Sequence, residues 1–135
     1  MIPTMKKKEV WLERRQHARF NVIGIRAYAM VRRHWPPSPV MGDIIDIGMG
    51  GLSFHYMGAE KQSSRSSYLD VLLSNSEFCL HKVPVRAISD VVSDPATGVS
   101  LGTRRCGIQF RNLTEEQQSH LRYFIQSHTT ADPEA

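Results

Sequence analysis

The sequence predicts an all-β domain, in which six short strands form an antiparallel barrel or sandwich and one helix follows them. Two observations support this fold class. Apolar residues recur at about every second position in a series of short segments, and stretches rich in glycine, proline, asparagine or aspartate separate these segments. The final segment changes to helical spacing. With 135 residues, the chain has the length of a single domain.

Three strands are predicted in the first half of the chain. Near-alternation of apolar residues predicts one long, half-buried strand over residues 20–33. The prolines within residues 35–39 end it, because proline cannot donate a hydrogen bond to a neighbouring strand. Strands over residues 40–47 and 52–56 follow, and the glycine-rich segment between them predicts a tight turn.

The second half predicts three more strands, over residues 68–73, 78–89 and 105–110. The periodicity then becomes helical. A capping-box sequence begins at Thr114, and the apolar residues that follow share one helical face. We therefore expect a helix over residues 114–127 that packs on the strands.

Composition and cysteine usage predict a soluble cytoplasmic protein. Apolar residues make up 41% of the chain and charged residues 22%, which is ordinary for a folded domain. No stretch approaches the ~18 to 20 apolar residues of a membrane helix, so we expect no membrane insertion. Cys79 and Cys106 match no metal-binding or redox spacing, and we interpret them as buried free thiols in a reducing compartment.

Positive charge is concentrated at the N-terminal end. Residues 1–33 contain nine Lys or Arg and two Glu, a local net charge of +7, whereas the whole chain has a net charge of +4. This asymmetry indicates a negatively charged partner at that end. The alternative is a solvated basic segment that only increases solubility.

Common catalytic and metal-binding patterns are absent from the sequence. The six histidines form no HExxH or other metal-ligand spacing. The sequence also lacks a phosphate-binding P-loop and the GxSxG motif of serine hydrolases. We therefore expect no enzyme activity, no metal site and no cofactor.

Two arginines form the first candidate binding motif. Arg15 and Arg19 are four residues apart, just before the first predicted strand. Guanidinium groups bind phosphate or the acceptor edge of guanine through two parallel hydrogen bonds, and a bent segment brings both arginines to one ligand. Alone the spacing is weak, because surface arginines are usually only solvated.

The glycine-rich turn is the second candidate. Asp46 can accept two hydrogen bonds from a guanine N–H pair, while Gly48, Gly50 and Gly51 let the backbone approach a flat ligand. The alternative is a purely structural hairpin, in which an aspartate and glycines are common.

Together these motifs resemble the PilZ domain family. The Arg-x-x-x-Arg segment, the Asp-x-x-x-x-Gly segment followed by Gly-Leu-Ser-Phe, and the segment from Arg105 to Glu116 occur in that family's order and spacing. The resemblance covers about residues 13–127. It implies a six-stranded antiparallel PilZ-like β-barrel with one C-terminal α-helix, which binds the bacterial second messenger cyclic di-GMP.

The resemblance also implies roles for single residues. Arg15 and Arg19 match the family's arginine clamp, and Asp46 and Gly51 match its Asp/Asn-x-Ser-x-x-Gly motif. Gly48 replaces the serine of that motif, so one hydroxyl that the family offers to the ligand is missing. We expect weaker binding, which Gly48→Ser restores if the backbone at this position has a negative φ.

Arg14 bears on the number of bound ligands. In PilZ-like proteins the residue directly before the clamp is associated with stoichiometry, and an arginine resembles the type that accommodates a stacked pair of cyclic dinucleotides. Arg14 is an additional donor for the charges of a second ligand. The alternative is a solvated arginine.

These observations lead to one preferred organisation. Residues 1–12 are expected to be a flexible arm, 13–127 the PilZ-like domain and 128–135 a frayed tail. The expected function is that of a signalling receptor, which orders its arm on the ligand and changes its surface for an unknown downstream partner. One alternative is a degenerate adaptor that acts by protein contact without the nucleotide. A second, nucleic-acid binding, lacks the aromatic strand motifs of RNA-binding domains.

Overall fold

The computed structural model describes residues 18–33, 39–58, 66–75, 77–95 and 102–130. Its strands and helix are β1 (Phe20–Asn21), β2 (Ala27–Arg33), β3 (Val40–Ile47), β4 (Gly51–Met57), β5 (Ser66–Leu73), β6 (Phe78–Asp94), β7 (Thr103–Phe110) and α2 (Glu115–His128). All strand pairs are antiparallel. The prediction of an all-β fold with one C-terminal helix is confirmed.

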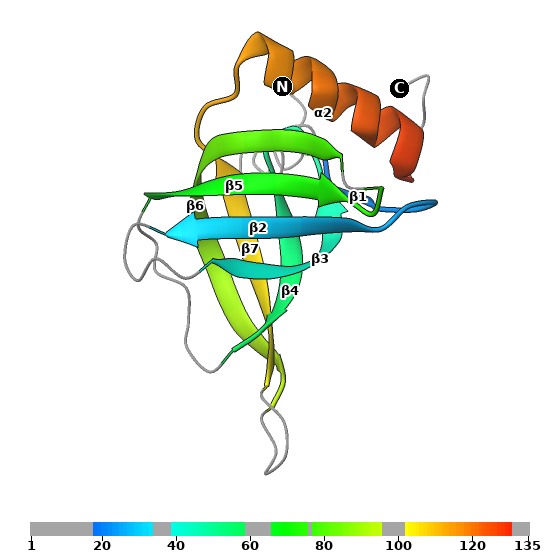
Figure 1. Cartoon of the computed structure of the whole chain (residues 1–135). Coiled ribbons are helices and arrows are strands. Elements are labelled where there is room, and N and C mark those ends of the chain that lie inside the picture. The colour runs from blue at the N-terminus through cyan, green and yellow to red at the C-terminus, as the bar shows by residue number, and fades with distance from the viewer. Residues whose placement is uncertain (1–17, 34–38, 59–65, 76, 96–101, 131–135) are drawn as a thin grey trace, which may run out of the picture.

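Six strands close into a barrel in the order β3–β2–β5–β6–β7–β4, and the pairing of β4 with β3 completes the ring. The two-residue strand β1 is added on β3 outside this ring. Figure 1 shows α2 lying across one end of the barrel, while the β6–β7 hairpin projects from the other end. The predicted six-stranded barrel is therefore confirmed.

The predicted single strand over residues 20–33 is wrong. Asn21 faces Asp46 of β3 and Tyr28 faces Asp43, so seven steps of the first segment match three steps of β3. The four extra residues leave the sheet at Gly24, which has a φ of +77° that glycine adopts without strain. Alternation alone does not reveal this excursion, because apolar residues continue on both sides of it.

The excursion pairs with the last residue of α2 and with the residue that follows it. The backbone N–H of Ile23 donates to the carbonyl of His128 over 2.7 Å, and Val22 forms a β-bridge with Thr129. Thr129 is buried, with 5% of its surface exposed. Residues 128–130, which we expected to fray, are therefore held against the first strand by main-chain hydrogen bonds, whereas residues 131–135 lie outside the described part.

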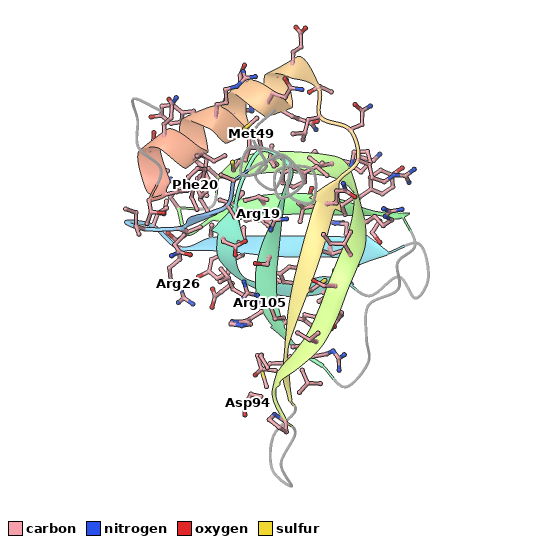
Figure 2. All side chains as sticks on the ribbon, turned by 180° about the vertical axis from the view of Figure 1, so that it is seen from behind. Arg19, Phe20, Arg26, Met49, Asp94 and Arg105 are labelled. Carbon is pink, nitrogen blue, oxygen red and sulfur yellow. The ribbon has the colours of Figure 1, made fainter. Side chains whose placement is uncertain are left out.

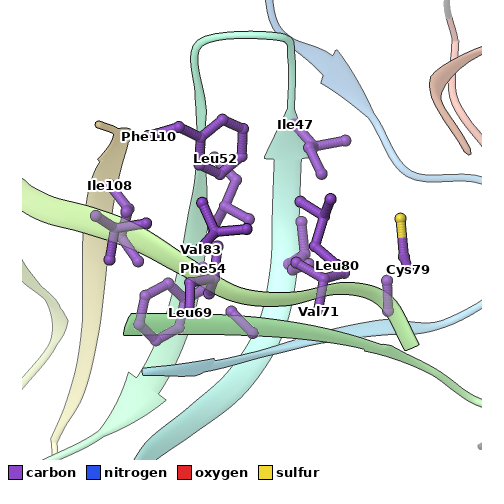
Figure 3. Close-up of a cluster of buried hydrophobic side chains, with 14 of the residues drawn as sticks. Ile47, Leu52, Phe54, Leu69, Val71, Cys79, Leu80, Val83, Ile108 and Phe110 are labelled. Atoms are coloured by element: carbon purple, nitrogen blue, oxygen red, sulfur yellow. The ribbon is translucent and has the colours of Figure 1, made fainter. Parts of the chain in front are cut away.

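The core fills the barrel and extends to the helix. Figure 3 shows large side chains from β3, β4, β5, β6 and β7 meeting inside the barrel. From α2, Leu121, Phe124 and Ile125 are buried, as their common helical face predicts. The capping box is present, because Thr114 and Gln117 exchange side-chain-to-backbone hydrogen bonds. The helix begins and packs as predicted.

Both cysteines are buried free thiols, as predicted. Burial raises the pKa of Cys79 to about 12 and that of Cys106 to about 12, which keeps both thiols protonated near neutral pH. Among the described residues, no three His, Cys, Asp or Glu side chains are arranged to hold a metal ion. The described part also contains no helix with the length and apolar character that a membrane crossing requires.

Candidate functional site

Asp46 lies at the centre of a polar cluster on the barrel wall. It faces Ser53 across the β3–β4 pair, next to a bulge in β3 that follows Ile44. The Ser53 hydroxyl donates to Asp46 Oδ1 over 2.8 Å. The side chain of Asp46 is 16% exposed, so its carboxylate is partly shielded but reachable from solvent.

Arg19 reaches this carboxylate from the segment before β1. Its Nη1 lies 3.1 Å from Asp46 Oδ1, and its side chain is 14% exposed. The pairing of Phe20 with Ile47 places Arg19 beside the end of β3. Two motif residues that are 27 positions apart in sequence are therefore in direct contact.

The glycine turn between β3 and β4 packs closely against Ala18 and Arg19. A Cβ at Gly48 would lie 2.0 Å from the Ala18 carbonyl oxygen and 3.4 Å from Arg19 Cδ. One at Gly51 would lie 2.0 Å from the Ile108 carbonyl oxygen and 3.0 Å from Arg19 Nη2. No side chain fits at either position unless the backbone moves.

This packing changes the interpretation of Gly48. Its φ lies outside the left-handed region, since Gly24 is the glycine with positive φ in the described residues. The backbone conformation at position 48 therefore allows a serine, but the Ala18 carbonyl occupies the space that its Cβ needs. Close approach of the backbone, rather than φ, requires glycine in this structure.

Backbone groups of the turn are bonded within the barrel. The Gly48 N–H donates to the Gly51 carbonyl over 2.9 Å, and the Gly50 carbonyl accepts from the Phe110 N–H over 2.9 Å. These bonds fix the turn between β3 and β4 and tie it to the end of β7. The turn is consequently a rigid element under Arg19.

Arg105 belongs to the same cluster, although sequence reasoning missed it. Its Nη2 lies 3.2 Å from Asp46 Oδ2 and 3.4 Å from Ser53 Oγ. Figure 2 shows Arg19 and Arg105 on the same face of the barrel. The alternation of the predicted strand 105–110 was enough to place position 105 outside the barrel, but only barrel closure shows that β7 lies next to β4.

Two predicted site residues, Arg14 and Arg15, lie outside the described residues. The described part of the site contains two arginines around one carboxylate, a local charge of +1. The two guanidinium groups together carry about ten N–H donors, more than Asp46 and Ser53 can accept. The arrangement is suited to binding an anion that has several acceptor atoms.

A second Asp–Arg cluster lies toward the projecting β6–β7 hairpin. Arg104 Nε lies 2.6 Å from Asp90 Oδ1, and the Tyr56 hydroxyl donates to Asp90 Oδ2. The Asp90 side chain is 1% exposed. The hydrogen bond and the charge of Asp90 raise the pKa of Arg104 above its usual value. This cluster is buried and joins β4, β6 and β7.

Two solved structures with cyclic di-GMP are similar to this chain. The PilZ domain of YcgR from Escherichia coli with cyclic di-GMP matches with a TM-score of 0.65 and 16% identity, over 84% of this chain and 90% of that one. The K. pneumonia MrkH–cyclic di-GMP complex matches with a TM-score of 0.63 and 16% identity, over 82% of this chain and 50% of that one. The chain thus spans about half the length of MrkH. At these identities the likeness shows the fold.

A search of curated proteins gave no match. The sequence model of the PilZ domain family, in contrast, matches residues 13–127. These are the residues over which the resemblance was seen, and they include the Arg19 segment, the Asp46 turn, the barrel and most of α2. The chain belongs to the PilZ domain family.

Proposed function

We propose that this protein is a cytoplasmic receptor for cyclic di-GMP and that it signals by binding rather than by catalysis. The observation that carries the proposal is the contact between Arg19 and Asp46, which joins the two sequence motifs of the family in one site. The solved PilZ domain of YcgR contains cyclic di-GMP, which supports the same ligand class here.

The chemistry of the cluster suits this ligand. Cyclic di-GMP carries two phosphates and two guanines, so it offers anionic oxygens and acceptor edges to arginine forks. We assign phosphate and guanine contacts to Arg15 and Arg19, and close backbone approach to Gly48, Gly50 and Gly51. Asp46 already accepts hydrogen bonds from three side chains, so a guanine N–H pair has to share this carboxylate with the arginines.

The proposed output is a change at the N-terminal segment. In this proposal residues 6–19 become ordered over the ligand and present a changed surface to a downstream protein partner. Amide hydrogen exchange of these residues is then slower with cyclic di-GMP than without it. Equal exchange in both states would contradict the ordering step and leave a preformed site.

A calorimetric titration of the full chain with cyclic di-GMP tests the proposal directly. We expect saturable binding, with GMP as the control for a single phosphate and guanine. A folded protein that gives no heat at millimolar cyclic di-GMP would contradict the receptor function.

One observation favours a second candidate, an adaptor that acts by protein contact alone. Gly48 lacks the hydroxyl of the family motif, and the Ala18 carbonyl occupies the adjoining space. Against it, Asp46 and Arg19 are retained and in contact. The same titration separates the two candidates, because only the receptor binds the nucleotide.

A further inference from the structure

Arg105 is the more open of the two arginines on Asp46. Its side chain is 47% exposed, against 14% for Arg19. Both of its hydrogen bonds use Nη2, at 3.2 Å and 3.4 Å. Within the described residues, its Nε and Nη1 have no hydrogen-bond partner. The Arg105 guanidinium is therefore held through Nη2 alone, and its Nε and Nη1 donors remain available to a ligand.

Beyond Arg105 the outer face of β7 carries small residues, and the Ser89 hydroxyl of β6 covers Gly107, since a Cβ at this glycine would lie 2.5 Å from Ser89 Oγ. Gly107 is two residues further on the same side of the strand and carries no side chain. It faces Ser53 on β4, the residue that also contacts Arg105. Beyond it lies Gln109, whose Oε1 is 3.5 Å from Arg86 Nη2 of β6. Glycine and serine residues thus lie between an arginine at one end and an amide–arginine pair at the other.

This strip is continuous with the clamp. Gln109 faces Gly51, the glycine on which Arg19 Nη2 rests. From Arg105 to Gln109 the strand spans about 13 Å, given the usual rise per residue of a strand. The residues between the glycine turn and Arg105 on this face, Ser53, Gly107 and Ser89, are small, so a planar, two-phosphate ligand seated on the glycine turn can extend over this strip.

We propose that Arg105 is a third ligand-binding arginine, which contacts the phosphate or guanine edge of the cyclic dinucleotide farther from Arg19. It supplies from β7 a charged donor that offsets the hydroxyl missing at Gly48. This proposal rests on the proposed cyclic di-GMP binding. Asp46 and Ser53 act as positioning residues for Arg105, because they hold Nη2 and leave the other donors free.

The test compares Arg105→Ala with Arg122→Ala, which removes the same charge from an exposed position on α2. We expect Arg105→Ala to weaken cyclic di-GMP binding by about 10- to 100-fold and Arg122→Ala by less than about 2-fold. Arg105→Lys, which keeps the charge but not the fork, should lie between them. Equal affinities for the two alanine variants, with a binding wild type, would overturn the role of Arg105 alone. A wild type that does not bind would overturn the receptor function and this inference with it.

A double-mutant cycle separates ligand contact from support of Asp46. If Arg105 only positions Asp46, then Arg105→Ala has no added effect in an Asp46→Asn background, whereas direct contact keeps the full loss. The Arg105 side-chain Nε–H resonance gives the answer should Asp46→Asn bind too weakly to titrate. Slowed solvent exchange of this proton in the wild-type complex supports direct contact, and unchanged exchange contradicts it.

Discussion

Arg104 and Arg105 are neighbours in β7, yet they belong to clusters with opposite properties. Arg104 points into the barrel and pairs with Asp90, whose side chain is 1% exposed. Arg105 points outward to Asp46, and its own side chain is 47% exposed. The alternation of a strand sends the same residue type to the core and to the surface in two consecutive positions.

The two clusters differ in whether their arginines keep N–H donors that no protein group accepts. In the inner cluster Asp90 joins three strands through Tyr56 and Arg104, and a buried charge pair must be well satisfied to offset its desolvation. In the outer cluster Asp46 holds two arginines that keep unused donors. The same chemistry therefore stabilises the barrel at one place and presents a binding surface at the other.

The largest expected effect follows removal of Asp90. Asp90→Ala removes a carboxylate that is 1% exposed and bonded to both Arg104 and Tyr56, so we expect a loss of about 3 kcal/mol in the free energy of unfolding. Asp46→Ala is the matched variant and should cost less, because the Asp46 side chain is 16% exposed against 1% for Asp90 and its partner Arg105 is 47% exposed. Urea denaturation of both proteins measures the difference. Equal losses would show that the two clusters do not divide stability and binding as described.

For cyclic di-GMP binding, in contrast to stability, we expect the larger loss from variants of the outer cluster. Arg19→Ala removes a charge-assisted contact to the ligand and should weaken cyclic di-GMP binding by about 1.5 to 3 kcal/mol, with the fold intact. Arg15→Ala is expected to have a similar effect because of its place in the clamp motif. Calorimetric titration and circular dichroism check affinity and folding. A folded Arg19→Ala protein that binds like the wild type would remove Arg19 from the site.

Gly48 tests how tightly the outer cluster is packed. Gly48→Ser places a Cβ against the Ala18 carbonyl, and displacing this segment should cost about 1 to 3 kcal/mol in ligand binding. Gly48→Ala is the control, since it adds the Cβ without the hydroxyl. We expect both variants to bind cyclic di-GMP more weakly than the wild type, and Gly48→Ser to lose less affinity than Gly48→Ala. Tighter binding by Gly48→Ser would show that the Ala18 segment moves away when the ligand binds.

The smallest expected change concerns stoichiometry rather than affinity. Arg14 at the position before the clamp predicts two ligands per chain at saturation, and Arg14→Leu should shift the ratio toward one. Titration at concentrations well above the dissociation constant measures this ratio. A ratio of one for the wild type would contradict the assignment of Arg14 but not the ligand.

The sequence predicted most of the barrel because its strands alternate and its turns are marked by glycine and proline. It failed between Phe20 and Ala27, where the excursion at Gly24 is stabilised by pairing with residues 128–130, a contact across almost the whole chain. The β6–β7 hairpin also extends further than expected, with β6 ending at Asp94. Main-chain pairing and the Asp90–Arg104 ion pair lengthen these strands, and charged residues carry no core signal in the sequence.

The site was predicted in part for the same reason. Asp46 and the glycines lie in one short motif, so local sequence was sufficient to find them. The contact of Arg105 with Asp46 could not be predicted from local sequence, because it depends on β7 lying next to β4 in the closed barrel. The effect of Gly48 depends on the Ala18 carbonyl, a packing contact that motif comparison does not contain.

The central claim, that the outer cluster binds cyclic di-GMP while the inner cluster supports the fold, can be tested by one nuclear magnetic resonance titration. Addition of cyclic di-GMP should shift the Arg19 Nε–H resonance and the backbone amides of residues 46–53 in a saturable way. The Arg104 Nε–H resonance should stay in place, because its partner Asp90 is buried. Absence of any saturable shift, or shifts centred on Arg104 and Asp90, would contradict the account.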